Sequence, residues 1–167
     1  MGSSKIIDQT SCMNTPYVVS RYYRAPELIL ASNQYDHSID IWATGCMLFE
    51  LITRTPMFPG DTEGLQIIEM QQILGAPDEY TIETIEKEMQ VEKNVMELFR
   101  KCCNLEKNQK LDLLQMFKSC RAYSEHNFYT EKDLMEAAKL IEKCLMWLPR
   151  DRLTAADAMQ HKFFADK

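Results

Sequence analysis

The chain has 167 residues, of which 19 are basic and 25 acidic, with a formal net charge of −6 and a hydrophobic share of 46%. This length predicts one compact unit, and the composition is typical of a globular chain rather than a disordered one. Because an acidic chain has no general attraction for phosphate backbones or anionic lipid, we expect no nucleic acid and no membrane among its partners.

The cysteines, the histidines and the N-terminus carry no signal for metal binding or export. Six cysteines and three histidines occur without a CxxC pair and without metal-ligand spacing. The N-terminal residues lack the apolar stretch of a secretory signal, and no apolar run reaches the length of a membrane span. We therefore expect reduced cysteines, no metal site, and a protein of the cytoplasm or nucleus.

The first part of the chain predicts a long loop followed by a buried helix. Residues 1–37 show no helical periodicity, and loops of this length in compact domains are often functional. Residues 38–53 predict a helix, with Ser38 as its expected N-terminal cap. Apolar residues cover nearly every face of this segment, so we expect it to be the central helix of the fold.

Further helices are predicted after the turn-rich stretch 55–61. One begins at Asp61 or Thr62 and stops at Gly75. Charged amphipathic stretches follow over residues 78–127. Their expected buried positions are Ile82, Ile85 and Met89 on one face, and Val95, Leu98, Phe99 and Cys102 on another.

Two helix starts are expected near the C-terminus, and the chain as a whole is predicted to be mainly α. Thr130 with Asp133 has the spacing of a capping box, and the helix it begins should continue through Leu148. Thr154 with Asp157 begins a last short helix. We find no internal repeat and little sign of a strand.

Three segments together resemble the lower lobe of a eukaryotic protein kinase. Ser20–Glu27 reads SRYYRAPE and ends on the Ala-Pro-Glu that closes the family's activation segment. Asp40–Gly45 matches the Asp-x-Trp-x-x-Gly of the family's central helix, and Arg152 matches the arginine that pairs with the Ala-Pro-Glu glutamate. The resemblance implies a kinase C-lobe with a central buried helix, from which the N-lobe and the catalytic loop are absent.

The resemblance covers the whole chain and implies a partial kinase domain over residues 1–167. Within it, residues 1–37 correspond to the activation segment and P+1 loop, and residues 38–53 to the F-type helix. Residues 54–129 correspond to the G-type helix and the insert of the CMGC group, and residues 130–167 to the H- and I-type helices.

Two CMGC subfamilies compete for the chain. Gly2-Ser3-Ser4-Lys5 resembles the stretch that begins at the Asp-Phe-Gly glycine of glycogen synthase kinases. The segment 15–19, Thr-Pro-Tyr-Val-Val, is similar instead to the dual-phosphorylation lip of the Jun N-terminal and MAP kinases. Both alternatives stay open on the sequence.

A set of phosphate-handling residues follows from the resemblance. Tyr17 and Thr15 are the expected phosphorylation sites, and Arg21 and Arg24 are the side chains expected to hold the phosphate, since guanidinium groups bind phosphate bidentately. Lys5 is expected to bind a phosphate on a primed substrate. The alternative interpretation is a loop tyrosine beside solvated arginines and one exposed lysine.

The remaining implied sites concern substrate binding and architecture. The P+1 loop, which receives the residue after the target, is implied to consist of Val18, Val19, Ser20, Tyr22 and Tyr23. Glu27 and Arg152 are expected to form a buried structural ion pair. The anchors of the central helix are implied to be Asp40, Trp42 and Gly45.

The chain lacks the residues that phosphoryl transfer requires. No Gly-x-Gly-x-x-Gly and no His-Arg-Asp occur, and Gly2 is all that corresponds to Asp-Phe-Gly. ATP and Mg²⁺ are therefore expected as cofactors of a full-length parent, and this chain is expected to bind neither and to contain no catalytic residue.

Two functions follow. The first is the substrate-binding lobe of a CMGC serine/threonine kinase, inactive as this chain alone, whose partners are a protein substrate or scaffold and the missing N-lobe. The alternative is a stand-alone, non-catalytic, pseudokinase-like interaction protein that docks partners through the helix at 61–75 and the loops beyond it.

The family's catalytic loop and preceding helix cover part of the central helix. Without them, we expect Trp42 and Phe49 to be left exposed and the chain to be of marginal stability or dependent on a partner.

Overall fold

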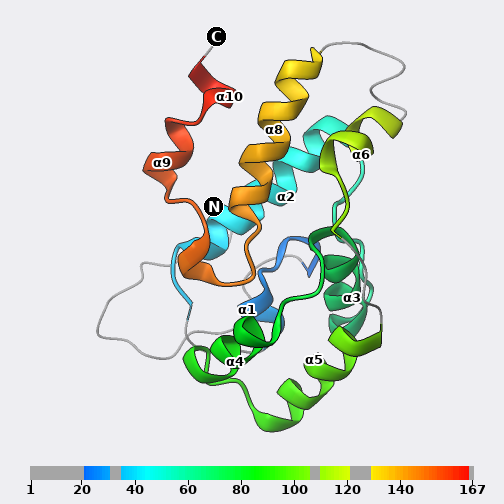
Figure 1. The fold of residues 1–167 in the computed structure, drawn as a ribbon, viewed down its shortest axis with the longest axis vertical. Helices are drawn as coiled ribbons and strands as arrows, with labels where there is room; N and C mark the ends of the chain where they lie inside the picture. Colours follow the sequence, from blue (N-terminus) through cyan, green and yellow to red (C-terminus); the bar gives the residue numbers. More distant parts are fainter. Residues whose placement is uncertain (1–20, 31–34, 106–109, 121–128, 166–167) are drawn as a thin grey trace.

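The computed structural model describes residues 21–30, 35–105, 110–120 and 129–165, and every regular element in these ranges is helical (Figure 1). The mainly α class is thereby confirmed. None of the helices in these ranges is both long and apolar enough to cross a membrane. The elements are η1 Arg21–Tyr23, α1 Pro26–Ile29, α2 Ser38–Thr53, α3 Glu63–Leu74, α4 Glu79–Glu88, α5 Lys93–Leu105, α6 Leu113–Ser119, α8 Glu131–Cys144, η2 Pro149–Asp151, α9 Ala155–Met159 and α10 Lys162–Ala165.

Helix α2 lies at the centre of the fold. It packs most extensively against α8, beside which it runs in Figure 1, and it also contacts η1 and η2. Helices α3 and α5 pack on each other in the other half of the molecule. The expected position of the 38–53 helix is thus confirmed, because its apolar residues have neighbours from several elements.

The residues expected to be exposed on α2 are in fact buried. Trp42 is 0% and Phe49 is 4% exposed, so the expectation that the shortened chain leaves them exposed is wrong. Trp42 stacks on Phe58 with ring centroids 5.7 Å apart, a contact supplied from within the chain. The apolar residues that α2 does expose are Met47, at 49%, and Leu51, at 67%.

The start of α2 also differs from the prediction. Ser38 is the first helical residue and not the cap, and the capping position is held by His37, whose side chain makes no capping hydrogen bond. The carboxylate of Asp36 accepts a 2.8 Å hydrogen bond from the Ser38 N–H instead. An acidic side chain two residues upstream therefore satisfies one of the helix's free amide donors.

The predicted start and stop signals of α3 are confirmed. The hydroxyl of Thr62 accepts a hydrogen bond from the Leu65 N–H. At the other end, Gly75 ends the helix with φ of 82°, a conformation that a residue without a side chain adopts at little cost.

The buried face predicted for α4 is confirmed. For α5, the prediction is wrong at one position, Leu98. Ile82, Ile85 and Met89 are each at most 5% exposed. Leu98 on α5 is 57% exposed, whereas Met96 is buried. The helical register of α5 turns Leu98 toward solvent, because Met96, Phe99 and the cysteines supply the apolar face that meets α3.

The capping box that begins α8 is confirmed, and its end comes earlier than predicted. Thr130 and Asp133 exchange side chain to backbone hydrogen bonds. The helix ends at Cys144 rather than Leu148. The Lys143 carbonyl accepts a hydrogen bond from the Leu153 N–H, so the chain after the helix folds back to satisfy the helix end.

Helices α2 and α8 approach each other closely at Gly45. A β-carbon at this position would lie 2.9 Å from the Cβ of Cys144 and 3.0 Å from the side chain of Leu145. These distances are below normal van der Waals contact, so the crossing of the two helices requires glycine here.

Gly45→Ala is expected to lower the free energy of unfolding by about 1–3 kcal/mol, because the added methyl group forces the two helices apart. The measurement is urea denaturation followed by circular dichroism. Gly64→Ala is the matched control, since a β-carbon at Gly64 on α3 would meet nothing within 4 Å, and its stability should stay level or rise. Equal losses in the two variants would contradict the close-approach account.

Candidate functional site

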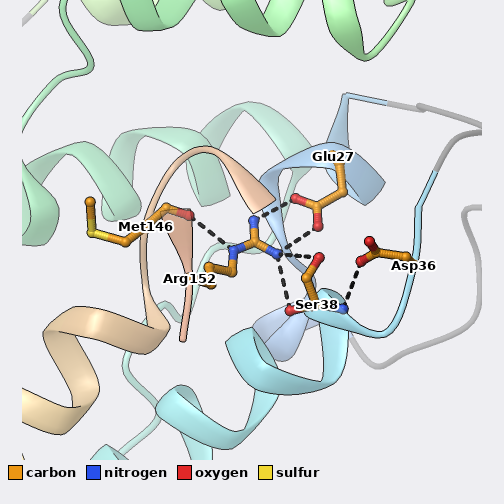
Figure 2. A network of polar contacts seen from close by, with 5 residues as sticks. All are labelled: Glu27, Asp36, Ser38, Met146 and Arg152. Carbon is orange, nitrogen blue, oxygen red and sulfur yellow. Dashed lines mark hydrogen bonds and ion pairs between the residues drawn. The ribbon is translucent and has the colours of Figure 1, made fainter. Parts of the chain in front are cut away.

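A buried ion pair joins the two ends of the described chain. Glu27 of α1 and Arg152, 125 residues later, form a bidentate contact in which the guanidinium donates to both carboxylate oxygens at 2.6 and 2.7 Å (Figure 2). Both side chains are fully buried. The structure therefore brings together two residues that the sequence pattern had paired.

Arg152 also donates hydrogen bonds to the backbone. Its Nε donates to the Met146 carbonyl at 3.0 Å, and its terminal nitrogen donates to the Ser38 carbonyl at 3.1 Å (Figure 2). The guanidinium carbon lies 5.1 Å from the centre of the Trp42 ring, within the range of a cation–π contact. One side chain thus connects α1, the first residue of α2 and the segment after α8.

The hydrogen bonds of this arginine determine what the pair does for stability. Taking two charges out of water costs several kcal/mol per ion, and their attraction offsets that cost only with good geometry and additional hydrogen bonds. Both conditions hold here, since the pair is bidentate and two backbone carbonyls accept further hydrogen bonds from the guanidinium. Loss of one partner would leave a buried charge with no solvent, so the pair fixes the arrangement of the three segments.

Asp36 extends this network at the surface. It is drawn beside Ser38 in Figure 2, where its carboxylate accepts the Ser38 N–H. Burial acts to raise the pKa of Asp36, but the hydrogen bonds from Ser38 outweigh it and hold the pKa below its usual value. The carboxylate therefore stays charged at neutral pH, as a helix N-terminus favours.

The segment before α1 is docked on the start of α3. The Arg21 guanidinium donates to the Asp61 carbonyl, and the Tyr22 hydroxyl lies 3.5 Å from the Asp61 carboxylate. Arg24, 7% exposed, has a terminal nitrogen 4.0 Å from the Glu63 carboxylate. The two arginines expected to hold phosphate are thus near each other and already face the backbone and acids of the 61–63 turn.

Tyr23 contacts α2, whereas Arg21 and Tyr22 contact the residues before α3. The Tyr23 hydroxyl donates a 2.7 Å hydrogen bond to Glu50, and this bond raises the pKa of Tyr23 above its usual value. Since Tyr22 and Tyr23 reach different helices, the short η1 turn is fixed between α3 and α2.

Several expected site residues lie outside the described residues. These are Lys5, Thr15, Tyr17, Val18, Val19 and Ser20.

The three expected anchors of α2 have different environments. Trp42 is buried, and its indole nitrogen has no hydrogen-bond partner within the described chain. Gly45 faces α8 as described above. Asp40 is exposed; its N–H donates a 3.1 Å hydrogen bond to the His37 carbonyl, and its carbonyl accepts one from the Thr44 hydroxyl at 2.7 Å.

Sequence reasoning missed the acids and carbonyls that complete the site. The Met146 and Ser38 carbonyls carry no side-chain signal, because any residue could supply them. Asp61 and Glu63 read only as helix-start residues. Asp36 could have been found, since an aspartate two residues before a helix is a frequent capping residue.

The described cysteines do not form a reactive site. They are free, and burial raises the pKa of Cys103 to about 12 and that of Cys144 to about 11. Burial also raises the pKa of Cys46. Such thiols stay protonated at neutral pH and behave as small apolar side chains. Within the described ranges, no group of three or more potential ligands could hold a metal ion.

The protein kinase domain model matches residues 1–164. The chain belongs to the protein kinase family. It is 37% identical over 163 residues to protein kinase gsk3 of Schizosaccharomyces pombe, and 34% identical over 165 residues to glycogen synthase kinase 1 of Pyricularia oryzae. It is 36% identical over 151 residues to the mitogen-activated protein kinase HOG1 of Wallemia muriae.

These relatives confirm that the chain belongs to the CMGC group of protein kinases, and their lengths show how much of such a kinase the chain covers. The alignments cover 98%, 99% and 90% of this chain, but only 36%, 36% and 47% of the respective relatives. The chain thus spans between a third and a half of their length. Similarity to glycogen synthase kinases and to MAP kinases agrees with the two resemblances in the N-terminal segment, and both subfamilies remain open.

Arg152→Met is expected to lower the free energy of unfolding by about 3–5 kcal/mol, because it leaves the Glu27 carboxylate buried without a partner. The measurement is urea denaturation at neutral pH. Lys101→Met is the matched control, since it breaks an ion pair with Glu97 in which both side chains are about 70% exposed; it should cost less than about 1 kcal/mol. Similar losses in the two variants would contradict the assigned role of the buried pair.

Proposed function

We propose that this chain is the C-terminal, substrate-binding lobe of a CMGC serine/threonine protein kinase. The parent reaction is the transfer of the γ-phosphoryl group of ATP to a serine or threonine hydroxyl of a protein, with Mg²⁺ as the metal cofactor. The observation that carries this proposal is the match of the protein kinase domain model to residues 1–164.

The chain alone is proposed to be inactive. Phosphoryl transfer requires a loop over the phosphates, a lysine for the α- and β-phosphates, a metal-binding aspartate and a catalytic base. The 167 residues contain no glycine-rich phosphate loop and no His-Arg-Asp sequence. The catalytic groups and the ATP site would have to come from residues outside this chain, and its coverage of only 36% and 47% of two relatives supports this proposal.

The chain's own contribution is proposed to be substrate positioning. The P+1 loop would consist of Val18, Val19 and Ser20 together with Tyr22 and Tyr23. The described part of that loop is held by its contacts with Asp61 and Glu50, and Glu27 of the buried ion pair follows four residues after Tyr23. A segment fixed at both sides can present a constant surface to a substrate peptide.

Phosphorylation is the proposed control of this segment. A phosphate on Tyr17, with a second on Thr15, would add negative charge close to Arg21 and Arg24 in the sequence. Lys5 is proposed to help bind the phosphate of a primed substrate, as the resemblance to glycogen synthase kinases suggests.

The phosphate would have to displace contacts that are already present. Arg21 is engaged by the Asp61 carbonyl, and Arg24 lies near the Glu63 carboxylate. A phosphate carries up to two negative charges and three acceptor oxygens, so it competes well with a single carbonyl and with a carboxylate at 4.0 Å.

The proposed partners are protein substrates or scaffolds and the N-lobe of the parent kinase, in the cytoplasm or nucleus. A second candidate is a stand-alone, non-catalytic interaction protein. The observation that favours it is the lack of catalytic motifs in the 167 residues.

The 167-residue chain is expected to give no binding heat with Mg²⁺-ATP in calorimetry, because it supplies no phosphate-binding loop.

The mass of the natural polypeptide separates the kinase lobe from the stand-alone interaction protein. A longer product that contains His-Arg-Asp and phosphorylates serine or threonine supports the kinase lobe, whereas a natural product of this length alone supports the interaction protein. Tight ATP binding by the 167-residue chain would contradict both candidates.

Phosphorylation at Tyr17 is expected to raise the free energy of unfolding by about 1–3 kcal/mol through new charge-assisted hydrogen bonds. The measurement compares phosphorylated and unphosphorylated chains by urea denaturation. Arg24→Gln should abolish the difference, while Arg54→Gln, an exposed arginine at the end of α2, should leave it intact. An unchanged difference in Arg24→Gln would exclude Arg24 as the phosphate-holding residue.

A further inference from the structure

Thr62 is an exposed threonine at the start of α3, and its hydroxyl group is only partly used. The hydroxyl oxygen accepts a hydrogen bond from the Leu65 N–H at 3.2 Å. Within the described residues, no acceptor is recorded for its own O–H. The hydroxyl is therefore accessible to an enzyme in solution and has a proton that it can lose.

An arginine from a distant part of the sequence lies beside this threonine. The Arg21 guanidinium donates to the Asp61 carbonyl, 40 residues later in the chain. The carbon of that carbonyl is bonded to the Thr62 nitrogen, so the guanidinium lies at the peptide group that leads into Thr62. A phosphate on the Thr62 hydroxyl would extend the side chain and come within reach of an exposed, flexible arginine.

Arg21 has donors left for such a phosphate. A guanidinium group carries five N–H donors. Within the described residues, the bond to the Asp61 carbonyl is the contact recorded for the Arg21 side chain, and the residue is exposed. A phosphate offers three acceptor oxygens and up to two negative charges, and guanidinium groups bind it bidentately. Arg21 can thus stay at the turn and hold a phosphate there.

Two exposed acids flank Thr62 and decide which enzyme would recognise it. Asp61 lies 3.5 Å from the Tyr22 hydroxyl, and Glu63 lies 4.0 Å from a nitrogen of Arg24. Both carboxylates repel a phosphate, but solvent screens exposed charges, and the start of a helix favours negative charge. The sequence Asp-Thr-Glu is complementary to a kinase whose substrate site is basic.

We propose that Thr62 is a phosphorylation site whose phosphate is held by Arg21, and that this contact withdraws Arg21 from the phosphate on Tyr17. In the modifying step, the Thr62 hydroxyl oxygen attacks the γ-phosphorus of ATP bound to a separate serine/threonine kinase. The new O–P bond forms as the bond to the bridging oxygen breaks, ADP leaves, and the hydroxyl proton passes to the base of that kinase. The withdrawal from Tyr17 rests on the proposed function, whereas the Thr62 site does not.

The first test is whether Thr62 accepts a phosphate. The full 167-residue chain is incubated with Mg²⁺-ATP and a serine/threonine kinase that prefers acidic substrates, and the modified residues are mapped by mass spectrometry. A phosphate on Thr62, absent from Thr62→Val, supports the site. Absence of phosphate from Thr62 in the unmodified sequence would overturn it.

The second test is whether Arg21 holds the phosphate. In a chain with phosphothreonine at Thr62, phosphorus NMR against pH follows the second ionisation of the phosphate, whose pKa is about 6 in solution. A nearby guanidinium favours the dianion, so this pKa should fall by about half a unit or more. Arg21→Gln should cancel the fall, and Arg150→Gln, at an exposed arginine paired with Glu88, should preserve it.

Phosphothreonine at Thr154 is the matched control. Thr154 is also an exposed helix cap, but its recorded side-chain contacts are with Asp157. The pKa of a phosphate there should stay at the solution value or rise, because the neighbouring charge is a carboxylate. Circular dichroism checks that each chain keeps its helix content. Equal falls at Thr62 and Thr154, or a fall that survives Arg21→Gln, would overturn Arg21 as the holding group.

The third test concerns the competition with Tyr17. Urea denaturation compares the stability gained from a phosphate on Tyr17 in chains with and without a phosphate on Thr62. The gain should shrink when Thr62 is modified, because two ligands of one arginine weaken each other. An unchanged gain would overturn the withdrawal of Arg21. No gain in either chain would contradict the proposed control by Tyr17 instead, and the NMR result would still decide the Thr62 site.

Discussion

The arrangement of the fold depends on the guanidinium group of Arg152. It binds the Glu27 carboxylate at 2.6 and 2.7 Å and two backbone carbonyls at about 3 Å, with both charged side chains fully buried. A buried charge has no solvent to replace a lost contact, so α1, the start of α2 and the segment after α8 must all be in place together. The position of the Arg21–Tyr23 turn, which lies just before α1, relative to the helical core follows from this constraint.

Helix α2 has two faces with opposite requirements. On one face, Gly45 allows the closest approach to α8, where even one methyl group would clash with Cys144. On the other face, Met47 and Leu51 are exposed. A helix that is apolar all round is explained by neighbours on every side. The described chain supplies those neighbours for Trp42 and Phe49 but not for Met47 and Leu51.

The sequence was sufficient where the signal is local or where a family pattern supplied it. Thr62 and Thr130 were identified as helix starts because a hydroxyl that accepts a hydrogen bond from a nearby amide needs only a short spacing. The Glu27–Arg152 pair spans 125 residues and was expected only from the family resemblance. The failures have long-range causes. The burial of Trp42 depends on Phe58 from the following connector, and the early end of α8 depends on a hydrogen bond from Leu153. Such contacts appear only when distant segments are placed together.

Tyr23 connects the segment before α1 with the exposed face of the central helix. It belongs to the segment expected to receive substrate, its hydroxyl binds Glu50 on α2, and it lines the depression beside Leu51. Met47, Leu51 and Arg54 line the same depression, so the hydrogen bond between Tyr23 and Glu50 lies at the edge of the exposed face of α2. The position of the Arg21–Tyr23 turn is therefore tied to the surroundings of that face.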